Sequence, residues 1–339
     1  MKEKILVTGG AGYIGSHTVV ELQQSDYDVV IIDNLSNSSE SVMKSIESIT
    51  GILPAFYNFD LCNAEKTKEF FNKEKNILGI IHFAAFKAVG ESVEFPLRYY
   101  RNNIFSLVNL LECMKEFSIN PFVFSSSCTV YGQPESLPVK ENSPIQKPSS
   151  PYGNTKQISE EIITDTTNIS AIKAIMLRYF NPIGAHESAI IGELPLGIPN
   201  NLVPFITQTA IGKRDYLRVF GNDWETPDGT CIRDYIHVVD LAKAHVIAVE
   251  RLLHMKNKTK CEIFNLGTGK GYSVLEAIQM FEKVSGQILN YKFTDRRAGD
   301  VEKVWADTSL ANTELGWKAE RDLEAMMLSA WNWEKHLNS

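Results

Sequence analysis

The chain has 339 residues, of which 44% are hydrophobic and 22% are charged, and its formal net charge is -7. Such a length predicts two domains, or one large domain with an added lobe, and the acidic balance argues against nucleic acid and anionic membranes as partners. No apolar run approaches membrane length, and residues 1–3 lead into an apolar segment without a secretory pattern. Five scattered cysteines without metal-ligand spacing predict reduced thiols in a cytoplasmic protein and no metal site.

The segment 4–33 carries the strongest pattern in the chain. An apolar run at 4–7 precedes glycines at 9, 12 and 15, a helical periodicity at 13–24, and a second apolar run that ends in Asp33. Glycines in such a turn let the backbone approach a pyrophosphate, while the helix N-terminus offers free N–H groups to the anion. A carboxylate at Asp33 would accept from a ribose 2′-hydroxyl and repel a 2′-phosphate. The segment therefore predicts NAD as the cofactor rather than NADP.

Strands and helices alternate through residue 180. We expect strands at 55–59, 79–85, 122–124 and 171–179, and helices at 41–49, 64–75, 96–117 and 152–167, with Asn63 as a helix cap. This alternation predicts an α/β fold with a doubly wound parallel sheet of the Rossmann type. Ligands bind such sheets beyond the carboxyl ends of the strands, so the residues that follow each strand are the candidates for function.

The composition changes after residue 180. Gly, Pro and Asn interrupt short apolar runs from 181 to 230, which predicts a smaller α/β lobe that binds the substrate. A helix at 239–253 and a strand at 262–266 would return the chain to the sheet, and Ser273 and Glu276 have capping-box spacing. The tail 323–336 is amphipathic. We expect an NAD-binding domain at 1–180, which the chain rejoins at about 236–268, and a substrate lobe at 181–235 and 269–339.

Tyr152 and Lys156 lie four residues apart at the start of an expected helix, so they share one face. An ammonium at about 4 Å, in an effective dielectric of roughly 20, would lower the pKa of a tyrosine by about 3 units, to near neutrality. A phenolate of this kind takes the proton of an alcohol while a nicotinamide takes the hydride. Ser127, at a strand end, is placed to bond the same oxygen. The spacing also occurs by chance, but the dinucleotide pattern upstream favours catalysis. His82, inside an apolar strand, is expected to be a core residue.

Three motifs resemble the extended short-chain dehydrogenase/reductase family, namely Gly-Gly-Ala-Gly-Tyr-Ile-Gly at 9–15, Ser-Ser-Ser at 125–127 and Tyr-Gly-Asn-Thr-Lys at 152–156. Four further segments, at 87–92, 178–182, 197–202 and 233–238, are similar to members that invert carbon 4 of UDP-hexoses. The match covers essentially the whole chain. It implies interconversion of UDP-glucose and UDP-galactose by transient oxidation on tightly bound NAD, in galactose metabolism. It also implies a homodimer formed through the helices at 96–117 and 152–167.

The resemblance also assigns site residues. It implies Tyr152 as base and acid, Lys156 as its electrostatic partner and Ser127 at the sugar oxygen. The cofactor contacts that it and the glycine pattern predict are Gly9, Gly12, Tyr13, Ile14, Gly15, Asp33, Asn34, Asn37, Ser38, Asp60, Leu61, Phe83, Ala84, Ala85, Lys87, Asn102, Tyr152, Lys156 and Tyr179. The implied substrate contacts are Lys87, Ser127, Tyr152, Asn181, Asn201, Leu202, Phe220, Arg233, Arg297, Asp300 and Val304. The two arginines also suit a bidentate grip on a diphosphate by their own chemistry.

One position departs from the members that are restricted to glucose and galactose. In those members a tyrosine narrows the sugar pocket just before a Trp-Ala-Asp motif, whereas here Val304 precedes that motif at 305–307. The smaller side chain leads to the hypothesis that UDP-GlcNAc and UDP-GalNAc are also interconverted.

Two alternatives share parts of this pattern. A nucleotide-sugar 4,6-dehydratase has the same fold, cofactor and Tyr/Lys pair, but it needs an Asp-Glu pair where this chain has Cys128 and Thr129. An NAD-binding regulator without turnover would not need Ser127, Tyr152 and Lys156 together. The sequence leaves the physiological direction and the relative rates open.

Overall fold

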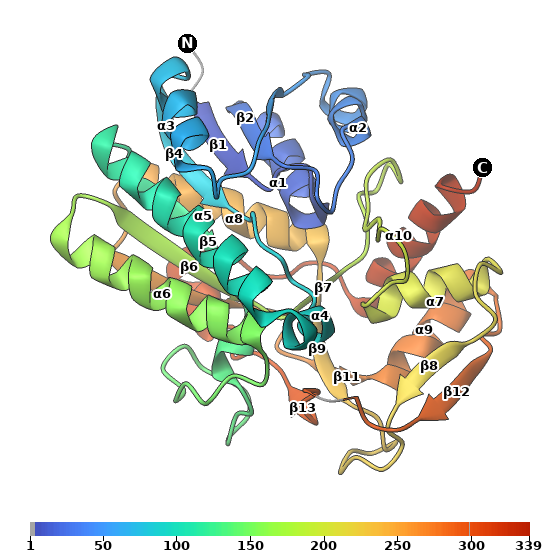
Figure 1. Ribbon diagram of the computed structural model, residues 1–339. Helices are drawn as coiled ribbons and strands as arrows, with labels where there is room; N and C mark the ends of the chain where they lie inside the picture. Colours follow the sequence, from blue (N-terminus) through green and yellow to red (C-terminus); the bar gives the residue numbers. More distant parts are fainter. Residues whose placement is uncertain (1–3, 298) are drawn as a thin grey trace.

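The computed structural model describes residues 4–297 and 299–339, so residues 1–3 of the expected N-terminal domain and residue 298 of the expected lobe lie outside it. Its main element is a seven-stranded sheet in the order β10-β6-β5-β4-β1-β2-β3 (Figure 1). Every neighbouring pair in this sheet is parallel, which confirms the predicted doubly wound α/β fold. The strands are β1 (Lys4–Thr8), β2 (Asp28–Asp33), β3 (Ala55–Asn58), β4 (Ile77–His82), β5 (Pro121–Ser125), β6 (Lys173–Tyr179) and β10 (Cys261–Leu266).

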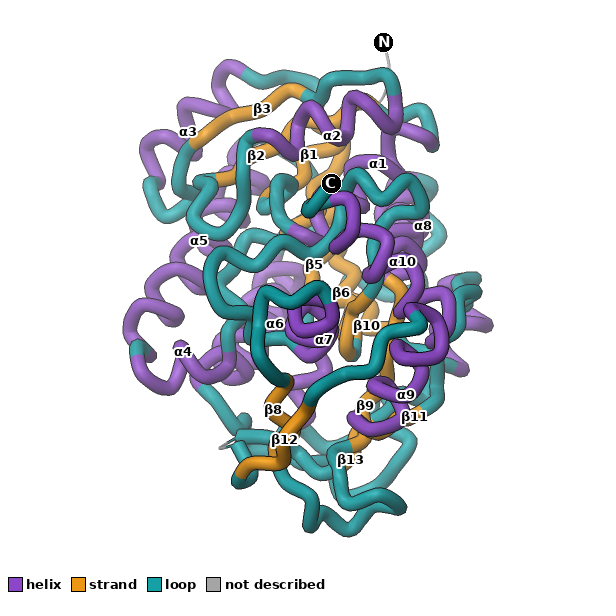
Figure 2. The backbone as a smooth tube through the Cα atoms, turned by 90° about the vertical axis from the view of Figure 1, so that its right-hand side faces the viewer, coloured by secondary structure: helices purple, strands orange, loops and turns teal. Residues whose placement is uncertain are grey.

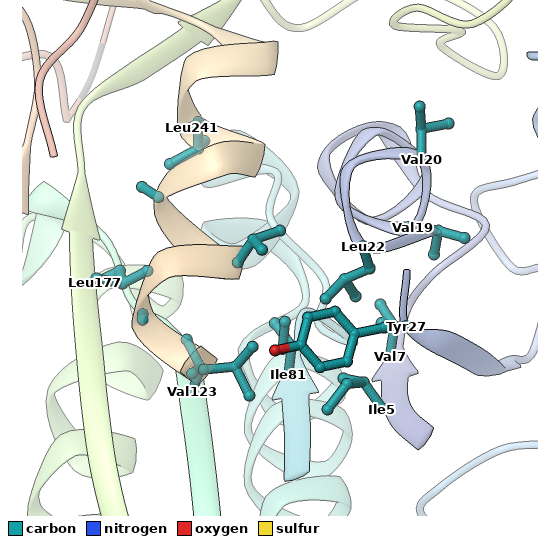
Figure 3. Packing of buried hydrophobic residues seen from close by; sticks show 14 of the residues in the cluster. Ile5, Val7, Val19, Val20, Leu22, Tyr27, Ile81, Val123, Leu177 and Leu241 are labelled. Carbon is teal, nitrogen blue, oxygen red and sulfur yellow. The ribbon is translucent and has the colours of Figure 1, made fainter. Parts of the chain in front are cut away.

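Helices cover both faces of this sheet. One face carries α1 (Tyr13–Gln24), α2 (Ser41–Thr50) and α8 (Val238–Leu253), and the other carries α3 (Ala64–Lys73), α5 (Pro96–Glu116) and α6 (Pro151–Ile169). Figure 3 shows Val7 and Ile81 of the sheet packed near Leu22 of α1. Leu6 lies between Ile5 and Val7 in β1, but its side chain belongs to the apolar cluster on the other face of the sheet. Both faces are therefore buried, which explains why these strands read as continuous apolar runs.

A second lobe is built around β9 (Ile232–His237), which pairs with β7 (Asn181–Ile183), β11 (Gly271–Ser273) and β13 (Lys303–Val304). Beside it β8 (Leu217–Phe220) pairs with β12 (Tyr291–Thr294), and the helices are α7 (Leu202–Ala210), α9 (Val274–Ser285) and α10 (Leu323–His336). These elements enclose a separate apolar cluster that includes Ile206, Phe281 and Met327. Figure 2 shows β8, β12 and β13 at the opposite end of the molecule from β2 and β3.

Several local predictions are confirmed. The Asn63 side chain accepts a hydrogen bond from the Lys66 N–H at 3.0 Å, Ser273 and Glu276 form a complete capping box, and α8 and β10 return the chain to the large sheet. The sequence did not predict α4 (Val89–Glu94), α7, or the short strands of the second lobe. Within the described residues, no helix has the length and apolar content that a membrane crossing requires.

Candidate functional site

A cavity of about 880 Å³ opens at the carboxyl ends of β1, β2 and β4 and reaches the start of α6. All of the residues predicted as cofactor contacts line it, from Gly9 and Asp33 on one side to Tyr152 and Tyr179 on the other. The structure thus brings together residues that are spread over most of the large domain. Their contact with a cofactor stays a prediction.

Gly9 after β1 and Gly15 in the first turn of α1 have no room for a side chain. A Cβ added at Gly9, where φ is +71°, would lie 2.7 Å from the Ala84 backbone nitrogen, and a Cβ at Gly15 would lie 2.2 Å from the Gly9 carbonyl oxygen. The backbone therefore packs on backbone at both glycines, and the first residues of α1, whose N–H groups have no partner within the helix, line the cavity. This arrangement fits a pyrophosphate.

Asp33 lies at the end of β2, beside this turn. Its Oδ2 accepts a hydrogen bond from the Ala11 N–H at 3.1 Å, and its Oδ1 accepts from the Leu35 N–H at 2.8 Å and the Ser38 hydroxyl at 3.0 Å. Burial raises the pKa of the Asp33 carboxyl, and these three hydrogen bonds offset part of that rise. The carboxylate is therefore fixed at the cavity wall by its own neighbours.

Tyr152, Lys156 and Ser127 meet where β5 ends and α6 begins. The Ser150 hydroxyl accepts from the Gly153 N–H at 3.2 Å and Pro151 takes the first helical position, so the start of α6 is fixed just before Tyr152. Tyr152 and Ser127 are both buried, the Ser127 hydroxyl lowers the pKa of the Tyr152 phenol, and its oxygen accepts from the Thr129 N–H at 3.2 Å. The Lys156 ammonium donates to the Ser125 carbonyl at 2.7 Å.

The prediction that Lys156 lowers the pKa of Tyr152 to near neutrality was wrong. Burial raises the pKa of the Tyr152 phenol above its ordinary value, Tyr179 adds to the rise, and the Ser127 hydroxyl offsets only part of it. Burial also lowers the pKa of Lys156 to about 8, against the opposing effect of Glu160. Loss of water around the phenolate outweighs the nearby ammonium, whose hydrogen bond goes to Ser125 instead.

Most of the predicted substrate contacts lie outside this cavity. Arg233 and Arg297 converge on Asp300, with nitrogen to oxygen distances of 3.8 Å and 2.8 Å, and the Arg297 guanidinium lies 5.3 Å from the centre of the Phe220 ring. Two guanidinium groups and a ring from separate segments therefore form one cluster in the second lobe. Such a cluster suits a diphosphate that carries an aromatic base.

The remaining predicted substrate residues are spread over the cavity wall and three elements of the second lobe. Lys87 and Asn201 line the cavity, and the side chains of both donate to Glu193 Oε1, at 3.2 Å and 2.5 Å. Val304 is buried in β13, and the cluster around it includes Tyr131. Asn181 opens β7 and Leu202 opens α7.

Two carboxylates near these residues were not predicted. Glu193 links Lys87 to Asn201, and no sequence pattern pointed to it. Glu160 lies one helical turn after Lys156, a spacing that could have revealed it. His82, by contrast, is the core residue that was expected, since it is buried and its Nδ1 pairs with the Thr8 hydroxyl at 2.7 Å. In the described part of the chain, no group of His, Cys, Asp and Glu could hold a metal ion.

The parallel sheet, the glycine turn and the Ser/Tyr/Lys arrangement define a Rossmann-fold enzyme of the short-chain dehydrogenase/reductase type. A family model described as GDP-mannose 4,6 dehydratase matches residues 6–329. The UDP-glucose 4-epimerase of Bacillus subtilis (strain 168) is 52% identical over 331 residues, which cover 97% of this chain and 96% of that one. The chain belongs to the UDP-glucose 4-epimerase family.

Solved structures agree with this assignment. The UDP-glucose 4-epimerase of Bifidobacterium longum, determined in complex with NAD+ and UDP, is 45% identical with a TM-score of 0.94, and the match covers 98% of each chain. The UDP-Glc/GlcNAc 4-epimerase of Campylobacter jejuni is 38% identical with a TM-score of 0.84, over 98% of this chain and 99% of that one.

Proposed function

We propose that this enzyme interconverts UDP-glucose and UDP-galactose by transient oxidation at carbon 4 of the sugar, with NAD bound in the cavity. The observation that carries the proposal is that Tyr152 and Lys156, one helical turn apart, line the same cavity as the glycine turn, while the Ser127 hydroxyl acts on Tyr152 from the end of β5. The Bifidobacterium relative was determined with NAD+ and UDP, which supports the same two ligands here.

NAD fits the residues that are present. Gly9 and Gly15 let the backbone fold tightly at the cavity wall, because a Cβ at either position would clash with neighbouring backbone atoms. Asp33 offers a carboxylate to a ribose diol. When bound, NAD supplies an acceptor that takes the hydride from carbon 4 and returns it. We propose that residues 1–180 and 236–268 hold it, and that 181–235 and 269–339 hold the nucleotide sugar.

The proton chemistry belongs to Tyr152. Its burial keeps the phenol protonated in the free enzyme, so the phenolate forms only where positive charge compensates for the lost water. The Lys156 ammonium is one such charge, and the other arrives with the oxidised cofactor. The Ser127 hydroxyl acts on Tyr152 and can relay the proton of the sugar 4-hydroxyl to the phenolate.

Inversion requires a firm hold on UDP and a loose hold on the hexose, because the keto-sugar must present its other face before it is reduced. We assign the firm hold to Arg233, Arg297 and Phe220, with Asn181, Asn201 and Leu202 as further contacts. A diphosphate would compete with Asp300 for both guanidinium groups.

We further propose that N-acetylated UDP-hexoses are substrates. Val304 pairs with Arg233 in the second lobe, so a larger side chain there would reach toward the substrate residues. The Campylobacter relative is named for activity on both UDP-Glc and UDP-GlcNAc. Val304→Tyr should remove turnover of UDP-GlcNAc and keep that of UDP-glucose, and a wild-type enzyme inactive on the acetylated pair would contradict the proposal.

Elimination of water, as in a dehydratase, is not favoured by the site. Cys128 and Thr129 follow Ser127 where that reaction needs two carboxylates, and burial raises the pKa of the Cys128 thiol to about 12, so it is not a ready base. The dehydratase description of the matching family model therefore reflects shared ancestry and fold.

We also propose a cytoplasmic homodimer formed through α5 and α6. Leu97 and Phe105 of α5 and Ile169 of α6 are exposed by 80%, 54% and 81% in the single chain, which leaves apolar side chains on both helices without cover. All five cysteines are free, which is consistent with a reducing compartment. Light scattering should give a mass near twice 38.1 kDa.

A labelled substrate tests the proposed chemistry. UDP-galactose carrying deuterium at carbon 4 should yield UDP-glucose that keeps the deuterium at the same carbon, because the hydride never leaves the enzyme. Loss of the label to water would show that the carbon is inverted by proton exchange, and the proposed role of NAD would fall.

A further inference from the structure

A buried ion pair lies directly behind the Ser/Tyr/Lys arrangement. Arg178 of β6 grips Glu160 of α6 with two bonds, from Nε to Oε1 at 2.9 Å and from Nη2 to Oε2 at 2.5 Å, and both side chains are almost fully buried. Replacing such a pair by apolar residues is often neutral or stabilising, because desolvation of two charges cancels most of their attraction. Stability alone therefore gives little reason to place these charges here.

The carboxylate of Glu160 also reaches the strand end that carries Ser127. The Ser126 hydroxyl donates to Glu160 Oε1 at 2.5 Å. On the same face of α6, Lys156 donates to the Ser125 carbonyl, and Tyr152 is acted on by the Ser127 hydroxyl, which lowers its pKa. Three side chains spaced by four residues on α6 thus face three consecutive serines.

The network continues on the far side of Arg178. Its Nη1 donates to the Tyr131 hydroxyl at 3.0 Å, and Tyr131 donates to Asn265 Oδ1 at 2.6 Å. Asn265 in turn donates to the Val139 carbonyl at 3.0 Å, and the Val139 N–H donates to the carbonyl of Trp305, next to Val304. The same ion pair therefore connects the catalytic helix with the segment that we place at the sugar.

We propose that Glu160, held by Arg178, is a positioning residue for the epimerase reaction that we assign above, and that it fixes Ser127 against Tyr152 through its bond to Ser126. It touches neither the substrate nor the cofactor in this scheme. It acts by setting the one geometry in which the serine and tyrosine hydroxyls meet at the same oxygen, where a misplacement of about 1 Å costs up to about 100-fold in rate.

Glu160 also acts on Lys156 through space. Its carboxylate raises the pKa of the ammonium, against the burial that lowers it to about 8. Of the other titratable groups, His82 of β4 interacts with Lys156, and Tyr152 interacts with Tyr99 of α5, Tyr179 of β6 and Cys128 in the turn after β5. Without Glu160, Lys156 would lose its proton at a lower pH, and the alkaline limb of the rate profile would move in the same direction.

The test compares three variants by kcat, KM and pH profile in the conversion of UDP-galactose to UDP-glucose. Glu160→Gln removes the charge, and Ser126→Ala removes only the bond to the serine. Glu262→Gln is the matched control, because it breaks another bidentate pair, with Arg251 at 2.7 Å and 3.0 Å, away from the cavity. We expect kcat to fall about 10-fold or more in Glu160→Gln and about 3-fold or more in Ser126→Ala, with KM within about 3-fold of wild type.

The alkaline limb should move to lower pH in Glu160→Gln only, and Glu262→Gln should lose thermal stability and keep its kcat and profile. Wild-type kcat in both Glu160→Gln and Ser126→Ala would overturn the proposal. A loss of kcat in Glu262→Gln as large as that in Glu160→Gln would also overturn it. If Glu160→Gln does not fold, Ser126→Ala decides alone, and wild-type kcat there would overturn it. A wild-type enzyme that does not convert UDP-galactose would instead refute the proposed function.

Discussion

Replacing Lys156 by methionine tests the electrostatic part of the mechanism. The side chain is only 4% exposed, and its ammonium donates to the Ser125 carbonyl at 2.7 Å and lies 4.7 Å from the centre of the Phe124 ring. A unit charge at about 5 Å from a developing phenolate, in an effective dielectric of roughly 20, is worth about 3 kcal/mol. That stabilisation corresponds to roughly a 100-fold loss of kcat in Lys156→Met.

The assay measures kcat for UDP-glucose formation between pH 6 and pH 10, a range of about 2 units on each side of the pKa of Lys156. The protonated lysine is the active form, and its pKa is about 8, so the wild-type rate should fall as the pH rises through that value. Lys156→Met has no such group, so its lower rate should not decline there. Thermal stability should not drop, because an apolar chain replaces a buried ammonium.

The control is Lys75→Met. The Lys75 ammonium also donates to a carbonyl, that of Phe71 at 3.1 Å, and lies 5.3 Å from the centre of the Phe117 ring, but on the surface. It should keep wild-type kcat. A rate for Lys156→Met within about 3-fold of wild type, with the alkaline decline unchanged, would refute the assigned role of Lys156.

Three further substitutions test the cofactor turn, the substrate cluster and the second lobe. Gly15→Ala places a Cβ 2.2 Å from the Gly9 carbonyl oxygen, so the purified protein should retain less NAD per chain than wild type. An NAD content equal to that of wild type would contradict the assignment of the glycine turn to the cofactor. Arg297→Ala should raise KM for UDP-galactose about 10-fold with kcat within about 3-fold, and the reverse pattern would place Arg297 in the chemistry. Asp234 is fully buried and accepts hydrogen bonds from the 268–269 turn and from Ala306, so Asp234→Ala should lower the free energy of unfolding by about 2–4 kcal/mol in urea titrations. Unchanged stability would show that those donors find other partners.

The large domain was predictable because its signals are local. Continuous apolar runs mark strands that are buried on both faces, and the cap at Asn63 fixes the start of α3 from within a few residues. The glycine turn and Asp33 lie in one short segment, so their proximity follows from sequence order alone.

The second lobe was harder to predict because its strands are short and pair over long separations. Two residues of β13, Lys303 and Val304, pair with β9, and such strands carry no periodicity of their own. Glu193 meets Lys87 and Asn201 through the tertiary fold, and the pKa of Tyr152 depends on its burial. Neither property is encoded in a local pattern.

The most direct measurement of the central claim uses the purified protein and UDP-galactose with no NAD added. We expect UDP-glucose to form, because the cavity that contains the glycine turn, Asp33 and Tyr152 is assigned to a cofactor that stays bound and returns its hydride in each turnover. Product that forms only after NAD is supplied would contradict the retained cofactor, and absence of product even with NAD would contradict the epimerase activity.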